Sequence, residues 1–212
     1  MKILLADDHK MMRDGLRAIL QKEDGVRVVG EAANGHEAIA LAHRLQAQVV
    51  VMDISMPGLN GVDATRRLVA EIPGIKVIGL SMNADPRYVM AMFKAGAVGY
   101  LLKNCASEEL IQAVRTVMED LTYISPAIAS IVVGGAVDDA PAPTVERPLS
   151  PREREVLQLL AEGQSSKDIA SSLELAVTTV ETHRRQIMDK LNIRTIAGLT
   201  KYAIREGITT VD

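Results

Sequence analysis

The chain has 212 residues, 48% of them hydrophobic, and a formal net charge of −3. No apolar run approaches the roughly 18 residues that a membrane span needs, and the N-terminus lacks the long apolar core and small-residue cleavage site of a signal peptide. These features argue against a membrane protein and predict a globular protein of the cytoplasm.

The charges are balanced along the chain. Basic and acidic side chains number 14 and 15 in residues 1–125, 1 and 3 in residues 126–147, and 9 and 9 in residues 148–212. Because no stretch is a basic tail, any contact with nucleic acid must come from a local patch. The single cysteine, Cys105, cannot form an internal disulfide and has no neighbouring Cys or His, so we expect a small, partly buried residue there.

Five short apolar runs divide the first half of the chain, at residues 3–6, 26–29, 49–52, 77–80 and 100–102. Segments with helical periodicity separate the runs, and one more follows the fifth run. This alternation predicts an α/β doubly wound, five-stranded parallel sheet with helices on both faces, over residues 1–120. Arg27 and Gly30 place the second strand nearer an edge, since central parallel strands are apolar on both faces.

A linker is predicted over residues 121–147, because glycine pairs, acidic residues and prolines replace the periodic pattern there, although residues 125–133 favour one short helix. The second domain, residues 148–212, starts with a capping box formed by Ser150 and Glu153. Its periodicity predicts a small all-α, four-helix domain, with helices over residues 150–161, 165–172, 177–191 and 195–206.

Polar side chains stand at the ends of the predicted strands: Asp7 and Asp8 after the first, Asp53 after the third, Ser81 after the fourth and Lys103 after the fifth. The carboxyl ends of parallel strands meet at one edge of the sheet, where such folds bind ligands. Because clustered carboxylates repel one another without a cation, we expect a Mg²⁺ site. Its predicted ligands are Asp7, Asp8, Asp53 and the backbone carbonyl of Ser55.

Asp53 is the best candidate for a nucleophile, because the turn at residues 56–58 leaves its carboxylate at the mouth of the loop. Lys103 can neutralise one oxygen of a transferring phosphoryl group, and Ser81 can donate to another. Each of these residues alone would be an ordinary cap or a solvated charge, so the prediction rests on their joint placement.

Residues 1–120 resemble a receiver domain, which has a flavodoxin-like fold. The matching motifs are "ADDH" at 6–9, "MDISMPGLNG" at 52–61, "GLSMNAD" at 79–85 and "AGAVGYLLK" at 95–103. The resemblance implies phosphotransfer from a partner histidine kinase to Asp53, with Ser81 and Tyr100 as switch residues. Two positions depart from the common pattern: Asn104 stands where many receivers have proline, and Ser81 replaces the commoner threonine but keeps the hydroxyl.

Residues 148–207 resemble the LuxR-type helix-turn-helix of NarL/FixJ-family response regulators. The matching segments are "LSPREREVLQLLAEGQSSKDIA" at 149–170 and "TVETHRRQIMDKL" at 179–191. The resemblance implies binding to double-stranded DNA as a homodimer that forms through helix 195–206. Gly198, near the start of that helix, is unfavourable for helix by roughly 1 kcal/mol relative to Ala.

Helical spacing over residues 177–191 points Val180, Ile187 and Leu191 inward and leaves a mixed polar face outside. On that face Arg185 suits guanine, Glu181 suits cytosine and the Thr182 methyl suits thymine. Phosphate contacts, which fix position without reading sequence, are predicted for Lys167, Thr178, Thr179, His183, Arg184 and Lys190.

Two of these residues have an alternative interpretation. Thr178 and Glu181 also have the spacing of a capping box, so Glu181 could close the helix instead of reading a base; Ala176, where the family has a polar cap, favours that later helix start. His183 could pack against the core instead of contacting DNA.

We weighed three functions. The first is a transcription factor switched by phosphorylation. Such a protein is not an enzyme, and its catalysis is limited at most to Mg²⁺-dependent self-phosphorylation and slow autodephosphorylation at Asp53. The second is a metal-dependent phosphohydrolase with an aspartyl-phosphate intermediate. Position 55, where such an enzyme would carry a general acid, is serine, and residues 148–207 would be unexplained. The third is a regulator that binds DNA without phosphorylation, which the intact acid cluster argues against.

Overall fold

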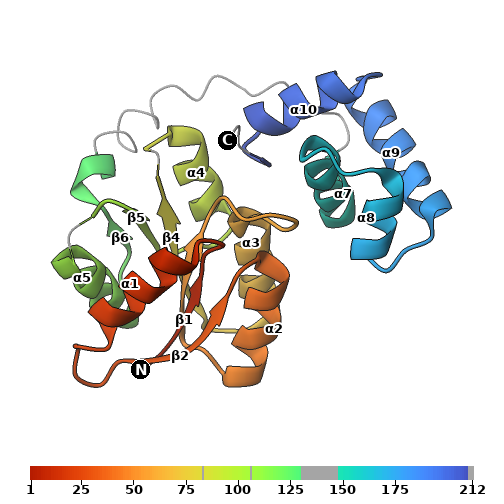
Figure 1. Ribbon diagram of the computed structural model, residues 1–212. Coiled ribbons are helices and arrows are strands. Elements are labelled where there is room, and N and C mark those ends of the chain that lie inside the picture. The colour runs from red at the N-terminus through yellow and green to blue at the C-terminus, as the bar shows by residue number, and fades with distance from the viewer. Residues whose placement is uncertain (83, 106, 130–147, 210–212) are drawn as a thin grey trace. The chain divides into compact units, whose positions relative to one another are not determined.

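The structure is a computed structural model, and it describes residues 1–82, 84–105, 107–129 and 148–209 (Figure 1). The chain divides into two compact units, residues 1–138 and 139–212. The division falls within the predicted linker, of which residues 130–147 lie outside the described residues. None of the described helices is long and apolar enough to cross a membrane.

Strands and helices alternate through the first unit. They are β1 (Lys2–Ala6), α1 (Lys10–Leu20), β2 (Arg27–Ala32), α2 (Gly35–Leu45), β3 (Val49–Asp53), α3 (Gly61–Glu71), β4 (Lys76–Ser81), α4 (Pro86–Lys94), β5 (Gly99–Leu102), α5 (Ser107–Met118) and β6 (Tyr123–Ile124). The sheet order is β2-β1-β3-β4-β5-β6, and every pairing is parallel. The predicted doubly wound sheet is confirmed, and so is the edge position of β2.

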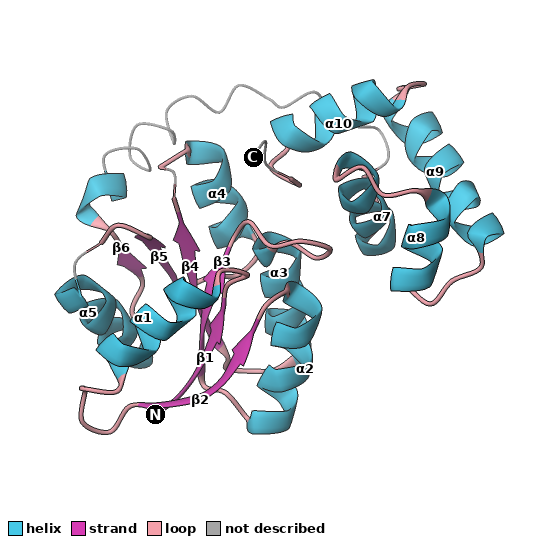
Figure 2. Cartoon of the chain, viewed as in Figure 1, coloured by secondary structure: helices cyan, strands magenta, loops and turns pink. Residues whose placement is uncertain are grey.

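Helices cover both faces of this sheet, as Figure 2 shows. Because side chains alternate along a strand, Val49 and Val51 of β3 pack in one core with residues of α1 and α5. Val50 and Met52 pack in another core with residues of α2, α3 and α4. Every residue of β3 is buried. Asp53 therefore ends one of the two middle strands of a sheet whose faces are both covered by an apolar core.

The sheet has one strand more than the five predicted. β6 pairs with β5, with Tyr123 opposite Gly99, and the Ser125 N–H donates to the Tyr100 carbonyl at 3.1 Å. Residues 126–129 are helical, and Ile128 is fully buried. The start of the predicted linker is therefore part of the first unit. A strand of two residues has no alternation to detect, so periodicity could not predict β6.

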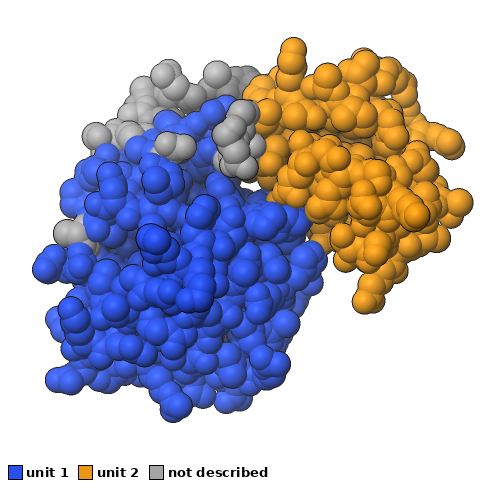
Figure 3. Space-filling model, in the orientation of Figure 1, with its two compact units in different colours: residues 1–138 blue, residues 139–212 orange. Residues whose placement is uncertain are grey.

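The second unit, coloured separately in Figure 3, is helical in its described residues. Its helices are α7 (Pro151–Ala161), α8 (Ser166–Ser172), α9 (Val177–Leu191) and α10 (Ile196–Arg205). The predicted capping box is confirmed: the Ser150 side chain accepts from the Glu153 N–H, and the Glu153 carboxylate accepts from the Ser150 N–H. All four helices contribute to one apolar core, which includes Val156, Ile169, Val180 and Leu199.

Candidate functional site

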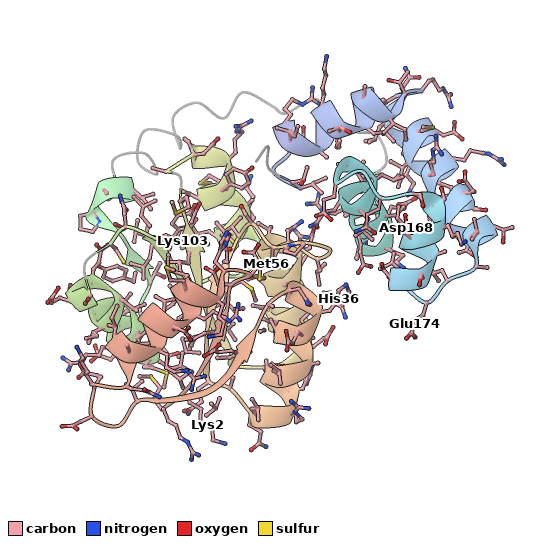
Figure 4. The ribbon with its side chains drawn as sticks, viewed as in Figure 1. Lys2, His36, Met56, Lys103, Asp168 and Glu174 are labelled. Carbon is pink, nitrogen blue, oxygen red and sulfur yellow. The ribbon has the colours of Figure 1, made fainter. Side chains whose placement is uncertain are left out.

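Three predicted site residues meet at the carboxyl edge of the sheet. Lys103 follows β5 and is labelled at this edge in Figure 4. Its Nζ lies 2.8 Å from Asp7 Oδ2 and 2.8 Å from Asp53 Oδ2. The three side chains are at most 6% exposed. One buried ammonium thus bridges two buried carboxylates that come from different strands.

Backbone groups hold the second oxygen of each buried carboxylate. The His9 N–H donates to Asp7 Oδ1 at 2.8 Å, and the Ser55 N–H donates to Asp53 Oδ1 at 3.2 Å. In both cases the donor is two residues beyond the carboxylate, so the turn that ends each strand also fixes its acid. Both carboxylates therefore have a defined orientation toward Lys103.

The charges in this cluster do not cancel, because two carboxylates share one ammonium. The pKa of Asp53 is raised to about 6, and burial is the largest cause of the rise. The charge of Asp7 raises this pKa further, whereas the hydrogen bond and the charge of Lys103 lower it. Burial opposes the charge of Lys103, but its interactions with Asp53 and Asp7 outweigh burial and raise the pKa of Lys103. The site favours a further cation, since an excess negative charge is held out of water.

The residues present fit a divalent metal ion. Asp7, Asp8, His9 and Asp53 each offer a ligand atom within 4.8 Å of the others. Three of these ligands are carboxylates, the hard oxygen donors that suit Mg²⁺. Asp8 is 31% exposed and Ser55 is also exposed, so this side of the cluster is open to solvent. The described contacts of Ser55 involve its N–H, and the role of its carbonyl as a ligand stays a prediction.

Ser81 and Tyr100 lie beside each other on neighbouring strands. Ser81 ends β4 and is buried, and Tyr100 in β5 is fully buried. Burial raises the pKa of Tyr100 to about 12, and a hydrogen bond with the Ser81 hydroxyl partly offsets that rise. The Tyr100 hydroxyl is therefore neutral at physiological pH and held inward by Ser81.

Two glycines shape the site and were not predicted from the sequence. A Cβ on Gly61 would lie 2.0 Å from the Asp53 carbonyl oxygen, and a Cβ on Gly79 would lie 2.9 Å from Met92 Cε and 3.4 Å from Tyr100 Cδ2. Gly61 thus lets α3 start against the backbone of Asp53, and Gly79 makes room for the side chain of Met92, which lies beside the ring of Tyr100. The motif "GLNG" contains Gly61, but no spacing rule indicates that its Cα touches the strand end.

In the second unit, α9 presents the polar face that its periodicity predicted. Val180 and Ile187 are fully buried, and Leu191 is half-buried. The exposed residues of the helix are Val177 at its start and the polar residues Thr178, Glu181, Thr182, Arg185, Gln186 and Asp189. The burial pattern confirms the orientation of the helix, and residue-by-residue contacts with a base stay predictions.

The capping-box interpretation of Glu181 is wrong. That interpretation needs Thr178 as the N-cap, but the helix starts at Val177, and its N-cap Ala176 has no side chain that can cap. Glu181 instead accepts a hydrogen bond from the Ser166 hydroxyl of α8 and lies 3.8 Å from Arg184. The carboxylate therefore links the two helices of the motif while staying exposed.

The predicted phosphate contacts differ in their surroundings. Lys167 and Thr178 are exposed, and Thr179, His183 and Arg184 are half-buried. In the part of the chain that the structure describes, the Nδ1 atom of His183 is buried without a hydrogen-bond partner.

Lys190 is the exception among these residues. Its Nζ lies 2.6 Å from Glu153 Oε2, and the Glu153 side chain is 4% exposed. Burial opposes ionisation of Glu153, but the hydrogen bonds of Lys190 and Ser150 outweigh it and lower the pKa of Glu153. Lys190 therefore fastens α9 to the start of α7, and a phosphate would have to share its ammonium with Glu153.

The predicted dimer helix has both a core face and an open face. Leu199 and Ala203 of α10 are fully buried, whereas Ile196 is 36% exposed. The N-cap Thr195 accepts from the Gly198 N–H at 3.1 Å, so Gly198 lies in the capped first turn. A Cβ on Gly198 would lie 2.7 Å from Ile193 Cγ2. Close packing against Ile193 therefore explains the glycine at this position.

Comparison with known proteins gives the same division of the chain. A family model described as a response regulator receiver domain matches residues 3–115, and one described as bacterial regulatory proteins, luxR family, matches residues 147–203. The oxygen regulatory protein NreC of Staphylococcus carnosus is 41% identical over 214 residues, which cover 98% of this chain and 99% of NreC. The transcriptional regulatory protein MctR of Rhizobium johnstonii is 37% identical over 209 residues, covering 99% and 95%.

A solved structure of the response regulator RcsB in complex with DNA is similar over 97% of this chain and 98% of that one, with a TM-score of 0.61 and 27% identity. A receiver domain followed by a LuxR-type helix-turn-helix defines a response regulator that controls transcription. This chain belongs to the NarL/FixJ family of such regulators.

Proposed function

We propose that this chain accepts a phosphoryl group on Asp53 from a cognate histidine kinase, and that phosphorylation controls DNA binding by α9. The observation that carries the proposal is the position of Lys103 Nζ, 2.8 Å from both Asp7 Oδ2 and Asp53 Oδ2. Catalysis of phosphoryl transfer consists mainly of positioning and charge neutralisation, and this cluster offers both without a general acid.

Each site residue has a distinct role in this proposal. A carboxylate oxygen of Asp53 attacks phosphorus as the donor histidine leaves, and Lys103 neutralises one phosphoryl oxygen. Ser81 donates its hydroxyl to another oxygen. Mg²⁺, held by Asp7, Asp8, Asp53 and the Ser55 carbonyl, would neutralise the phosphoryl oxygens when bound.

The switch follows from the contact between Ser81 and Tyr100. If the Ser81 hydroxyl turns to the phosphoryl group, Tyr100 loses its hydrogen bond with Ser81. A hydrogen bond of this kind contributes about 1 kcal/mol, and its loss favours a second orientation of Tyr100. The surface around β4 and β5 would then change, and a homodimer would form on DNA through α10. The protein would encounter both its kinase and its promoter in the cytoplasm.

A labelling experiment tests the phosphorylation site. The full chain is incubated with a small phosphodonor and Mg²⁺, and the bound phosphoryl group is counted by mass spectrometry of the intact protein. The D53N substitution should abolish labelling, because an amide is a poor nucleophile. The D24N substitution, which removes an exposed acid, should not change labelling. Stoichiometric labelling of D53N would contradict the assignment.

For DNA binding we propose base contacts from Glu181, Thr182 and Arg185, and phosphate contacts from Lys167, Thr178, Thr179, His183, Arg184 and Lys190. The exposed polar face of α9 supports this division, and so does the similarity to a regulator solved with DNA. Arg185 has the clearest prediction, because it is exposed and an arginine can contact guanine through two hydrogen bonds.

Binding assays on specific and random duplexes test the role of Arg185. Replacing it with alanine should weaken binding to the specific site by about 1–3 kcal/mol more than binding to random DNA. Arg27→Ala removes the same charge from an exposed position of the first unit and should change binding to neither duplex. Equal losses on both duplexes would make Arg185 a phosphate contact. Footprints with and without phosphodonor would then test the coupling between the two sites.

A further inference from the structure

His9 stands at the edge of the acid cluster, and its side chain contacts the carboxylates and not the helix that follows. It occupies the N-cap position of α1, where a short oxygen-bearing side chain usually caps the helix, yet its side chain makes no capping hydrogen bond. The imidazole turns to the carboxylates instead. Its Nδ1 lies 2.7 Å from Asp8 Oδ1 and 3.4 Å from Asp7 Oδ1.

These distances match the spacing of neighbouring ligands on one metal ion. In an octahedral site with bonds of about 2.1 Å, adjacent ligand atoms lie about 3.0 Å apart. The two distances from His9 Nδ1 fall on either side of that value. The ligand atoms of all four residues, Asp53 included, lie within 4.8 Å of one another.

The oxygen of Asp7 that Lys103 does not engage lies on the side of His9. Lys103 binds Oδ2 of Asp7 and Oδ2 of Asp53, and it is Oδ1 of Asp7 that lies near His9 Nδ1. The side chain of His9 is 71% exposed. Its ring can therefore adjust to an ion without disturbing either core of the sheet.

We infer that His9 supplies a nitrogen ligand to the divalent metal held by Asp7, Asp8 and Asp53. Imidazole suits first-row transition metals, whereas Mg²⁺ prefers oxygen ligands and retains water. The site therefore binds Mn²⁺ over Mg²⁺ by a larger factor than its carboxylates alone would give. This inference rests on the proposed metal site and adds a ligand that selects among metals.

Pulsed electron paramagnetic resonance on the full chain with Mn²⁺ tests the ligand directly. Protein labelled with ¹⁵N only in its histidine rings should show a ¹⁵N coupling to bound Mn²⁺. The H9F substitution keeps a ring but has no ligand atom, so the coupling should vanish. H43F, at a histidine of α2 that pairs with Glu71, should keep it. A wild-type spectrum without the coupling overturns the inference, and that result needs no variant to fold.

Metal affinities give a second readout. Even an outer-shell substitution commonly costs about tenfold in metal affinity, so H9F should weaken Mn²⁺ binding by about tenfold or more and Mg²⁺ binding by a smaller factor. Equal losses for both ions, or none, would refute the inference. If Mn²⁺ binds without an imidazole coupling while Mg²⁺ still supports labelling of Asp53, His9 is not a ligand and the proposed function stands. If neither ion binds, the metal site itself is refuted.

Discussion

Replacing Asp53 with asparagine should make the first unit more stable near neutral pH. The Asp53 side chain is 2% exposed, and its pKa in the folded protein is raised from 3.8 to about 6. The folded state therefore holds its proton more tightly than the unfolded state, and ionisation costs about 3 kcal/mol of stability at pH 7. An amide of the same shape avoids this cost and keeps an oxygen for Lys103, so D53N should gain up to that amount.

The sign of the pH dependence distinguishes this mechanism from a simple packing effect. Because the folded pKa is the higher one, wild-type stability should fall as the pH rises from about 4 to about 6, and D53N should lack that decline. Urea unfolding can be followed by near-UV circular dichroism, since three of the four tyrosines lie in the first unit. D24N is the matched control. A D53N protein less stable than wild type at pH 7, or with the same slope, would refute the reasoning.

Two further predictions concern packing. Gly61→Ala should destabilise the first unit by about 3 kcal/mol, because the new Cβ meets the rigid Asp53 carbonyl. Gly15→Ala in α1 should stabilise the first unit by up to about 1 kcal/mol, because no atom lies within 4 Å of the new Cβ. Similar thermal midpoints for the two variants would contradict this contrast. In the second unit, a double-mutant cycle of Glu153→Gln and Lys190→Met should give a coupling of about 1–2 kcal/mol in thermal unfolding, and additive effects would mean that the ion pair contributes nothing.

Much of the fold could be predicted because its signals are local. The continuous apolar run of β3, the polar residues of β2 and the capping box at Ser150 each need only a few neighbouring residues, and each is present in the structure. The acid cluster was also accessible, because parallel strands necessarily bring their carboxyl ends to one edge.

The features that could not be predicted depend on contacts between distant segments. Lys190 has the charge of a phosphate contact, and no residue near it in the sequence indicates that the Glu153 carboxylate lies 2.6 Å from its Nζ. The partner of Glu181 is likewise on another helix, so local spacing suggested a capping role that it does not have. The close approach of Gly61 to Asp53 is a property of how α3 docks on the sheet.

The ammonium that bridges Asp7 and Asp53 belongs to Lys103, the residue after β5, and this late position in the chain has a consequence during synthesis. A ribosome that has released only the first three strands exposes two acids at neighbouring strand ends without their counterion. Since like charges in one site disfavour the compact state, these strands gain their full stability only after Lys103 has emerged and β5 has paired with β4. Nascent or truncated chains that lack β5 and Lys103 should therefore be poor phosphate acceptors, so a histidine kinase would phosphorylate mainly completed chains.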